Sequence, residues 1–320
     1  MENSLGLQML HATEVGAIAS ARAAGFGNKN KADKAAVEAM RGHLNSVEFS
    51  GRVVIGEGER DEAPMLFIGE KLGSGRGMKI DIAVDPLENT NATATLGPRA
   101  ISTLAASEQG GLFHAPDTYM NKIVVGPESA GKVSLDKTPK ENLKAIAKAL
   151  GRKVGDLVIV VLERERNEKL VANIRRAGAR VKLVPDGDLM PGIAASMRGT
   201  GIHAVMGIGA APEGVITAAG LRCIGGEMQA RFWPKDSSDA RRIKDMGGRV
   251  DKIYTHEDLA KGKWILFCAT GVTSGEMLTG VRFFGGGART NSIMLSTETQ
   301  KVRFIDTTHT FDRRAIKYML

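Results

Sequence analysis

The chain has 320 residues, of which 42% are hydrophobic and 25% charged, with a net charge of +8 at pH 7. This length predicts two domains, and the composition is that of an ordinary globular protein. No apolar run approaches the ~18 residues that a membrane helix needs, and the first residues lack the pattern of a signal peptide. We therefore expect a cytoplasmic protein with no membrane partner. Because aromatic residues are only 5%, the positive charge favours a small anion over nucleic acid.

Two helices are predicted first, over residues 5–24 and 32–44. Asp33 begins a stripe of the second helix that is otherwise apolar, at helical spacing. The other members of this stripe are Val37, Met40 and Leu44. Asp33 is therefore either an acid that complements the helix dipole or a ligand that points into a site.

An acid-rich loop, Gly56–Glu62, follows a strand predicted at 53–55. Glu57 lies between two glycines, which allow the backbone to turn tightly and hold the carboxylate close to a partner. The alternative is a solvated acidic loop. Pro64 is suited to the first turn of a helix, so we predict a helix over 64–72.

The segment Asp85–Thr90 follows an apolar run, Ile80–Val84, that reads as a buried strand. Pro86 lacks a backbone donor, so we expect the strand to end there. Asp85 and Glu88 can then converge on one hard cation such as Mg²⁺, with the Thr90 hydroxyl close to a bound phosphate. The alternative is an acidic turn closed by a side chain–backbone hydrogen bond.

Regular alternation of strands and helices is predicted for the rest of the chain. The strands are expected at 101–105, 122–125, 157–162, 181–184, 203–208 and 264–268. Helices are expected over 137–150 and after the strands that begin at 157, 181 and 203. The sequence therefore predicts an α/β protein with domains 1–155 and 156–320. We expect a mixed sheet in the first domain and a mostly parallel sheet in the second.

Polar residues follow the strands of the C-terminal half, where open α/β sheets bind ligands. Arg164 and Arg166 can hold a phosphate bidentately, or they belong to a solvated loop. Asp186 and Asp188 can accept hydrogen bonds from sugar hydroxyls, or they cap the next helix. Glu213 also has a capping explanation, because it lies at the start of a helix.

Five carboxylates at strand ends or helix starts form a candidate metal site: Asp33, Glu57, Asp85, Glu88 and Glu213. Ligands that are all oxygen favour Mg²⁺ or Mn²⁺ over zinc. The six histidines do not pair at metal-binding spacing, so a structural role is expected for each. A dinucleotide-binding fingerprint that begins at Gly207 is interrupted by Pro212.

These residues resemble the class II fructose-1,6-bisphosphatases of the GlpX type, over most of the chain from Leu7 to His309. The near-literal blocks are Val54–Glu59, Asp61–Leu66, Asp81–Pro86, Pro185–Asp188 and Ala211–Gly214. The resemblance implies a two-domain α-β-α-β-α sugar-phosphatase fold and hydrolysis of the 1-phosphate of fructose 1,6-bisphosphate. It also implies that the five carboxylates bind Mg²⁺ or Mn²⁺, and we expect a homo-oligomer, a dimer or a tetramer.

The resemblance assigns Thr90 to the scissile phosphate, and we expect Asp61 or Glu59 to accept the proton of the attacking water. Residues expected to contact the substrate are Glu88, Asn89, Thr90, Tyr119, Arg164, Glu165, Arg166, Asp186, Gly187, Asp188 and Ala210. Three of these depart from the pattern. Asn89 replaces a glycine but tolerates a left-handed backbone, Ala210 stands where glycine is common, and Glu165 makes the arginine loop less basic.

Two alternatives stay open at this point. The same chemistry can act on sedoheptulose bisphosphate or an inositol phosphate, although two arginines remote from the metal-binding turn favour a bisphosphate. A non-catalytic sugar-phosphate sensor or nucleic-acid binder is the other alternative, and the set of carboxylates argues against it.

Overall fold

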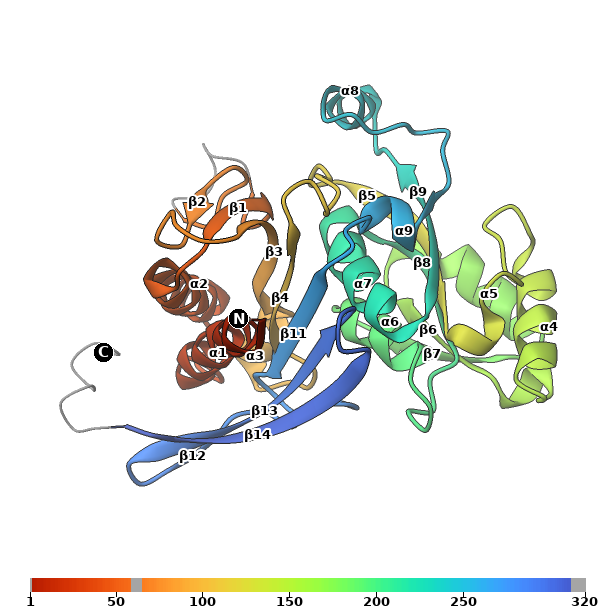
Figure 1. The fold of residues 1–320 in the computed structure, drawn as a ribbon. Helices are drawn as coiled ribbons and strands as arrows, with labels where there is room; N and C mark the ends of the chain where they lie inside the picture. The colour runs from red at the N-terminus through yellow and green to blue at the C-terminus, as the bar shows by residue number, and fades with distance from the viewer. Residues whose placement is uncertain (1, 59–64, 312–320) are drawn as a thin grey trace. The chain divides into compact units, whose positions relative to one another are not determined.

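Pairing of the last strands of the chain with its first ones divides the protein into two units. The computed structural model describes residues 2–58 and 65–311 (Figure 1). The first unit joins the residues up to Gln109 to those from Leu266 onward, and the second is Gly110–Ile265. This division differs from the predicted boundary near Gly155, which lies inside the second unit. Local patterns identify the strands, but they do not show which sheet each strand joins.

The first unit contains a mixed sheet, as predicted. Within the described residues, its strand order is β12-β13-β11-β4-β3-β1-β2, and β14 pairs with β13. β1 and β3 are parallel and β3 and β4 antiparallel, and β13 pairs with β11, β12 and β14 in antiparallel fashion. The strands are β1 (Ser50–Ile55), β2 (Lys71–Leu72), β3 (Lys79–Glu88), β4 (Ile101–Glu108), β11 (Ile265–Gly271), β12 (Arg282–Phe284), β13 (Gly287–Ser296) and β14 (Lys301–Thr310).

Both N-terminal helices are confirmed, as α1 (Glu2–Arg22) and α2 (Lys29–Ser46). They pack against each other, and α1 also contacts β3, β4 and β13. The predicted apolar stripe of α2 is buried at Val37, Met40 and Leu44. Among the described helices, none has the length and apolar character needed to cross a bilayer.

The prediction of a helix over 64–72 is wrong for the described residues 65–72, which contain the short strand β2. Leu66 and Gly69 have φ values of 52° and 94°, in the left-handed region that a helix excludes. The Leu66 N–H donates to the carboxylate of Glu70. A side-chain hydrogen bond thus replaces the helical ladder there.

The strand that leads to Asp85 does not end at Pro86 as predicted. β3 continues to Glu88, and its register with β4 shifts between Asp85 and Glu88. Such a β-bulge accommodates proline, because a residue in the bulge need not donate to the ladder. Asn89 follows with φ 71°, and its side chain accepts from Ala92 N at the start of α3 (Thr90–Thr95). The expectation that asparagine preserves this turn is confirmed.

The second unit also contains a mixed sheet, where a mostly parallel one was predicted. Its strand order is β10-β9-β5-β8-β6-β7. The parallel strands are β6, β7 and β8, whereas β5 pairs with β8 and β9 in antiparallel fashion. The strands are β5 (Tyr119–Val125), β6 (Val158–Leu162), β7 (Arg180–Val184), β8 (Ala204–Ala210), β9 (Glu227–Trp233) and β10 (Tyr254–Thr255). β11, which was expected in this sheet, pairs with β13 in the first one.

Helices cover both faces of the second sheet (Figure 1). On one face, α4 and α5 bury Leu143 and Ile174 against Ile123 and Ile159 of the sheet. On the other, α6 and α7 contact β5 and β8. The helices are α4 (Pro139–Ala149), α5 (Glu168–Arg176), α6 (Leu189–Ala195), α7 (Ala211–Ile224), α8 (Ser237–Asp245) and α9 (His256–Leu259), with 3-10 turns at Pro127–Ser129, Val154–Asp156 and Glu165–Asn167. The predicted α/β architecture is therefore confirmed.

Asn89→Ala should lower the free energy of unfolding by about 1–2 kcal/mol. The change removes the α3 cap, and alanine keeps a Cβ in the left-handed backbone without the local hydrogen bonds by which asparagine tolerates that conformation. Urea unfolding measures this change. Asn89→Gly is the matched control, because glycine tolerates the backbone and costs only a few tenths of a kcal/mol as a cap. Equal stability of the two variants would contradict the conformational explanation.

Candidate active site

The carboxylates predicted in the first unit follow two neighbouring parallel strands. Ile55, the last residue of β1, pairs with Ala83 of β3. Glu57 lies two residues beyond Ile55, and Asp85 two residues beyond Ala83. Because parallel strands end at the same edge of a sheet, both carboxylates lie at one edge. Glu88, at the end of β3, is buried.

The helical turn that carries Asp33 lies beside the end of β3. Ala32 and Ala36 share an apolar cluster with Leu87, the residue before Glu88. Burial raises the pKa of the Asp33 carboxyl above its ordinary value. The fold thus brings Asp33 into the same region as the strand-end carboxylates. The apolar stripe of the helix did not by itself decide between this position and a role at the helix start.

Tight packing holds the backbone at Glu57. Its N–H donates to the Leu66 carbonyl at 3.0 Å, and a Cβ at Gly56 would collide with that same carbonyl oxygen. Asp61 and Glu59, the predicted proton acceptors, lie outside the described residues.

The residues of the second unit that are predicted to bind substrate gather at one edge of its sheet. Because β5 runs antiparallel to β8, Tyr119 at its start pairs with Ala210 at the end of β8. The Arg166 guanidinium carbon lies 4.3 Å from the centroid of the Tyr119 ring, a cation–π arrangement. Arg166 Nε also donates to the Ile208 carbonyl at 3.2 Å.

Arg164 and Asp186 form an ion pair across the ends of β6 and β7. Glu165 between the two arginines is exposed, and Gly187 has φ 78°. This positive φ explains the glycine between the two aspartates. The alternative that Asp188 caps α6 is wrong: Asp188 holds the N-cap position, but its side chain makes no capping hydrogen bond.

Lys122 contacts two residues of the candidate site, and sequence reasoning missed it. Its side chain is only 4% exposed, and Nζ lies 2.7 Å from Asp188 Oδ2. Nζ also donates to the Ala210 carbonyl at 3.1 Å. A lysine is almost never buried without a partner, so a lysine inside the apolar strand 122–125 was an available signal.

Glu213 lies in the first turn of α7, and the helix has no side-chain cap. Its Oε2 atom is buried and has no hydrogen-bond partner among the residues that the structure describes. Burial raises the pKa of Glu213 to about 7, although the nearby charge of Lys122 opposes the shift. A buried carboxylate oxygen without a partner is costly, so this atom is suited to a cation.

Comparison with known proteins gives a consistent result. A family model described as bacterial fructose-1,6-bisphosphatase, glpX-encoded, matches residues 3–309. A protein of Synechococcus sp. strain JA-3-3Ab is 48% identical over 337 residues, covering 98% of this chain and 97% of the relative. A protein of Synechococcus elongatus is 47% identical, covering 98% of each chain. Both are named D-fructose 1,6-bisphosphatase class 2/sedoheptulose 1,7-bisphosphatase. The chain belongs to the glpX-encoded family of bacterial fructose-1,6-bisphosphatases.

Proposed function

We propose that this protein is a metal-dependent phosphomonoester hydrolase that converts fructose 1,6-bisphosphate to fructose 6-phosphate and phosphate. One observation carries the proposal beyond family membership. Carboxylates occupy the joint ends of β1 and β3, and the Thr90 hydroxyl follows them directly at the start of α3. This pattern suits an enzyme that binds a cation and a phosphate together.

The proposed metal ligands are Asp33, Glu57, Asp85, Glu88 and Glu213, with Mg²⁺ or Mn²⁺ as the ion. The buried Oε2 of Glu213 supports this assignment, because it lacks a hydrogen-bond partner among the described residues and an oxygen there needs a positive partner. The bound ion would polarise the phosphate and balance charge on the leaving oxygen.

Thr90 is proposed to orient the attacking water at the phosphorus atom. A threonine hydroxyl is a weak base, so Asp61 or Glu59 is proposed to accept the proton of that water. Because phosphoryl transfer needs little covalent chemistry from the protein, orientation and neutralisation of charge supply most of the catalysis.

The second unit is proposed to hold the sugar and its distal phosphate. Arg164 and Arg166 would anchor that phosphate, and Tyr119 would support Arg166 through the ring contact. Asp186 and Asp188 would accept from sugar hydroxyls. The remaining proposed contacts are Glu88, Asn89, Thr90, Glu165, Gly187 and Ala210.

Sedoheptulose bisphosphate is the second candidate substrate, because the relatives' names include that activity. It presents the same 1-phosphate and a distal phosphate one carbon further away, so the same residues can serve both sugars. We further propose a cytoplasmic homo-oligomer that acts on small metabolites and does not bind nucleic acid.

Steady release of phosphate from fructose 1,6-bisphosphate is expected with Mg²⁺ or Mn²⁺, and EDTA should abolish it. Thr90→Val should lower kcat by roughly 10²–10⁴ with little change in KM, since a positioned acid–base participant contributes about that much. A colourimetric phosphate assay over sugar mono- and bisphosphates measures both. Near-normal kcat in the variant would remove Thr90 from the chemistry, and metal-independent release would contradict the proposed ligands.

Arg164→Ala should raise KM for bisphosphates about tenfold or more, the loss of one charged hydrogen bond. A small monophosphate without a distal phosphate should be hydrolysed as before. Arg180→Ala is the control, because Arg180 is an exposed residue at the start of β7, the opposite end from the arginine loop. Equal damage to both substrates would refute the anchoring role.

Glu213→Gln should stabilise the metal-free protein at pH 8 by about 1–3 kcal/mol, because the change removes a buried charge whose Oε2 has no partner in the part of the chain that the structure describes. Urea unfolding in EDTA tests this, and activity with metal should fall. Glu163→Gln, at an exposed residue after β6, should leave stability almost unchanged. Lower stability of the Glu213 variant in EDTA would show that its carboxylate is already satisfied without a cation.

A further inference from the structure

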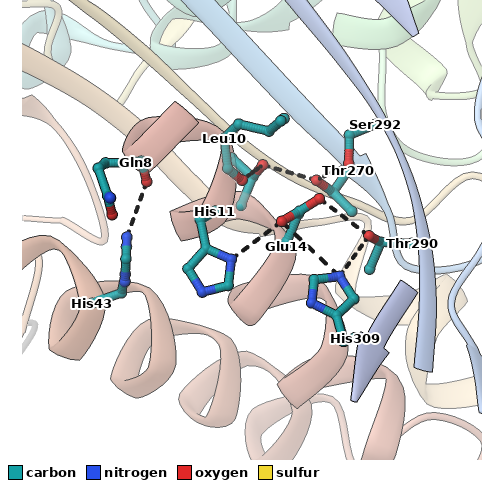
Figure 2. Close-up of polar contacts among 10 residues, drawn as sticks. Gln8, Leu10, His11, Glu14, His43, Thr270, Thr290, Ser292 and His309 are labelled. Atoms are coloured by element: carbon teal, nitrogen blue, oxygen red, sulfur yellow. Dashed lines mark hydrogen bonds and ion pairs between the residues drawn. The ribbon is translucent and has the colours of Figure 1, made fainter. Parts of the chain in front are cut away.

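Two histidines and a buried glutamate converge between α1 and β14, outside the residues assigned above (Figure 2). Glu14 is only 4% exposed. Its Oε2 lies 3.2 Å from His11 Nδ1 and 4.0 Å from His309 Nε2. One ligand atom from each of these side chains lies within 4.8 Å of the other two.

Local geometry and strand register explain the convergence. His11 and Glu14 are three residues apart, so they lie on one face of α1. His309 pairs with Ala288, and Thr307 pairs with Thr290 in the β13–β14 ladder. Since alternate residues of a strand share a face, Thr290 and His309 lie on the same side, and Figure 2 shows both directed toward Glu14.

We propose that His11, Glu14 and His309 form a second metal site, for a divalent transition ion such as Zn²⁺. Two imidazoles and one carboxylate are a preferred zinc set, and a water molecule completes the coordination. Ligand atoms around one zinc ion lie roughly 3.0–3.4 Å apart, given metal–ligand distances of about 2.0–2.1 Å. The His11–Glu14 pair already meets this spacing. His309 Nε2 needs to approach Glu14 Oε2 by less than about 1 Å from 4.0 Å, and the ligand atoms of the two imidazoles, which lie within 4.8 Å of each other, need to approach by less than about 2 Å.

Outer hydrogen bonds hold the proposed ligands in place. The Thr290 hydroxyl donates to Glu14 Oε1 at 3.3 Å and lies 2.9 Å from His309 Nε2. Oε1 is thus occupied, while Oε2 is directed at the two imidazoles, as in a monodentate ligand with an outer partner. Coordination through His309 Nε2 requires the tautomer protonated at Nδ1. That tautomer shift exchanges the contact with Thr290 for the bond to the ion.

A third histidine supports His11. The ring of His43 packs edge-on against His11, with centroids 4.6 Å apart, and His43 Nε2 lies 3.0 Å from the Gln8 carbonyl. The side chain of His11 is 44% exposed, so an ion can reach the site from solvent. Mg²⁺ prefers ligands that are all oxygen, whereas imidazole favours zinc and its neighbours. The two proposed metal sites therefore differ in chemistry.

The proposed ion would join α1 to β14, two elements from opposite ends of the chain. A metal that binds only the folded state stabilises that state by mass action. This inference does not depend on the proposed hydrolase activity, since its readouts are metal binding and thermal stability.

The test is a Zn²⁺ titration of the full-length, tag-free protein by calorimetry, after EDTA treatment and dialysis, with excess Mg²⁺ present. We expect one Zn²⁺ per chain and a rise in Tm of about 2 °C or more. Co²⁺ in place of Zn²⁺ should give intense visible absorption, because bound imidazoles lower its coordination number and symmetry. Asp85→Asn, which alters the proposed catalytic site, should bind Zn²⁺ unchanged.

Affinity for Zn²⁺ should fall more than about a hundredfold in His309→Ala and in Glu14→Gln, because the loss of an outer partner alone typically costs about 10–100-fold. His114→Gln is the matched control, at an exposed histidine of the second unit. If Glu14→Gln does not fold, His11→Ala provides the decisive comparison, because this half-exposed side chain is not part of the core. Absence of Zn²⁺ binding in Mg²⁺, binding that survives His309→Ala and His11→Ala, or binding lost in Asp85→Asn would each overturn the site.

Discussion

The cost of burying carboxylates governs the candidate sites of both units. An ionised carboxylate leaves water at a cost of several kcal/mol unless a cation or several hydrogen bonds replace its solvation. Burial raises the pKa of Glu14, but hydrogen bonds from His11 and Thr307 reverse the shift, and its pKa lies below the ordinary value. Asp188 is paired with Lys122, whereas Glu213 keeps a buried oxygen without a partner in the described structure. Glu14 and Asp188 therefore already have partners for their charge, whereas Glu213 still requires a positive partner.

Sheet topology decides which side chains these carboxylates meet. In the second unit, β5 enters the sheet antiparallel to β8, which brings Tyr119 at its start to the strand ends that carry the arginines and aspartates. The same strand places Lys122 on the α7 face, where a Cβ at Gly214 would lie 3.6 Å from its Cδ. A fully parallel sheet would bring the other end of β5 to this edge. The mixed arrangement is thus a condition for the substrate site that we propose.

Much of the candidate site could be predicted from sequence because its signals are local. The carboxylates beside Gly56 and Pro86 follow apolar strands, and the fold places Glu57 and Asp85 at one sheet edge as those patterns indicate. Asn89 adopts the left-handed backbone that its substitution for glycine required. Strand and helix positions could be predicted where the hydrophobic periodicity extends over several residues. The conformation of the segment after Pro64 instead depends on a side-chain hydrogen bond, which periodicity does not encode.

Sequence alone determined the family, the α/β class and the residue types that a metal-dependent phosphatase needs, since these depend on short motifs and local periodicity. Tertiary structure decided which strands share a sheet, and therefore that the chain divides after Gln109 and before Leu266. It also decided that Lys122 lies beside Asp188, and that His309 meets a glutamate 295 positions earlier, at Glu14. Contacts between such distant positions arise from strand pairing and helix packing, and spacing along the chain carries no record of them.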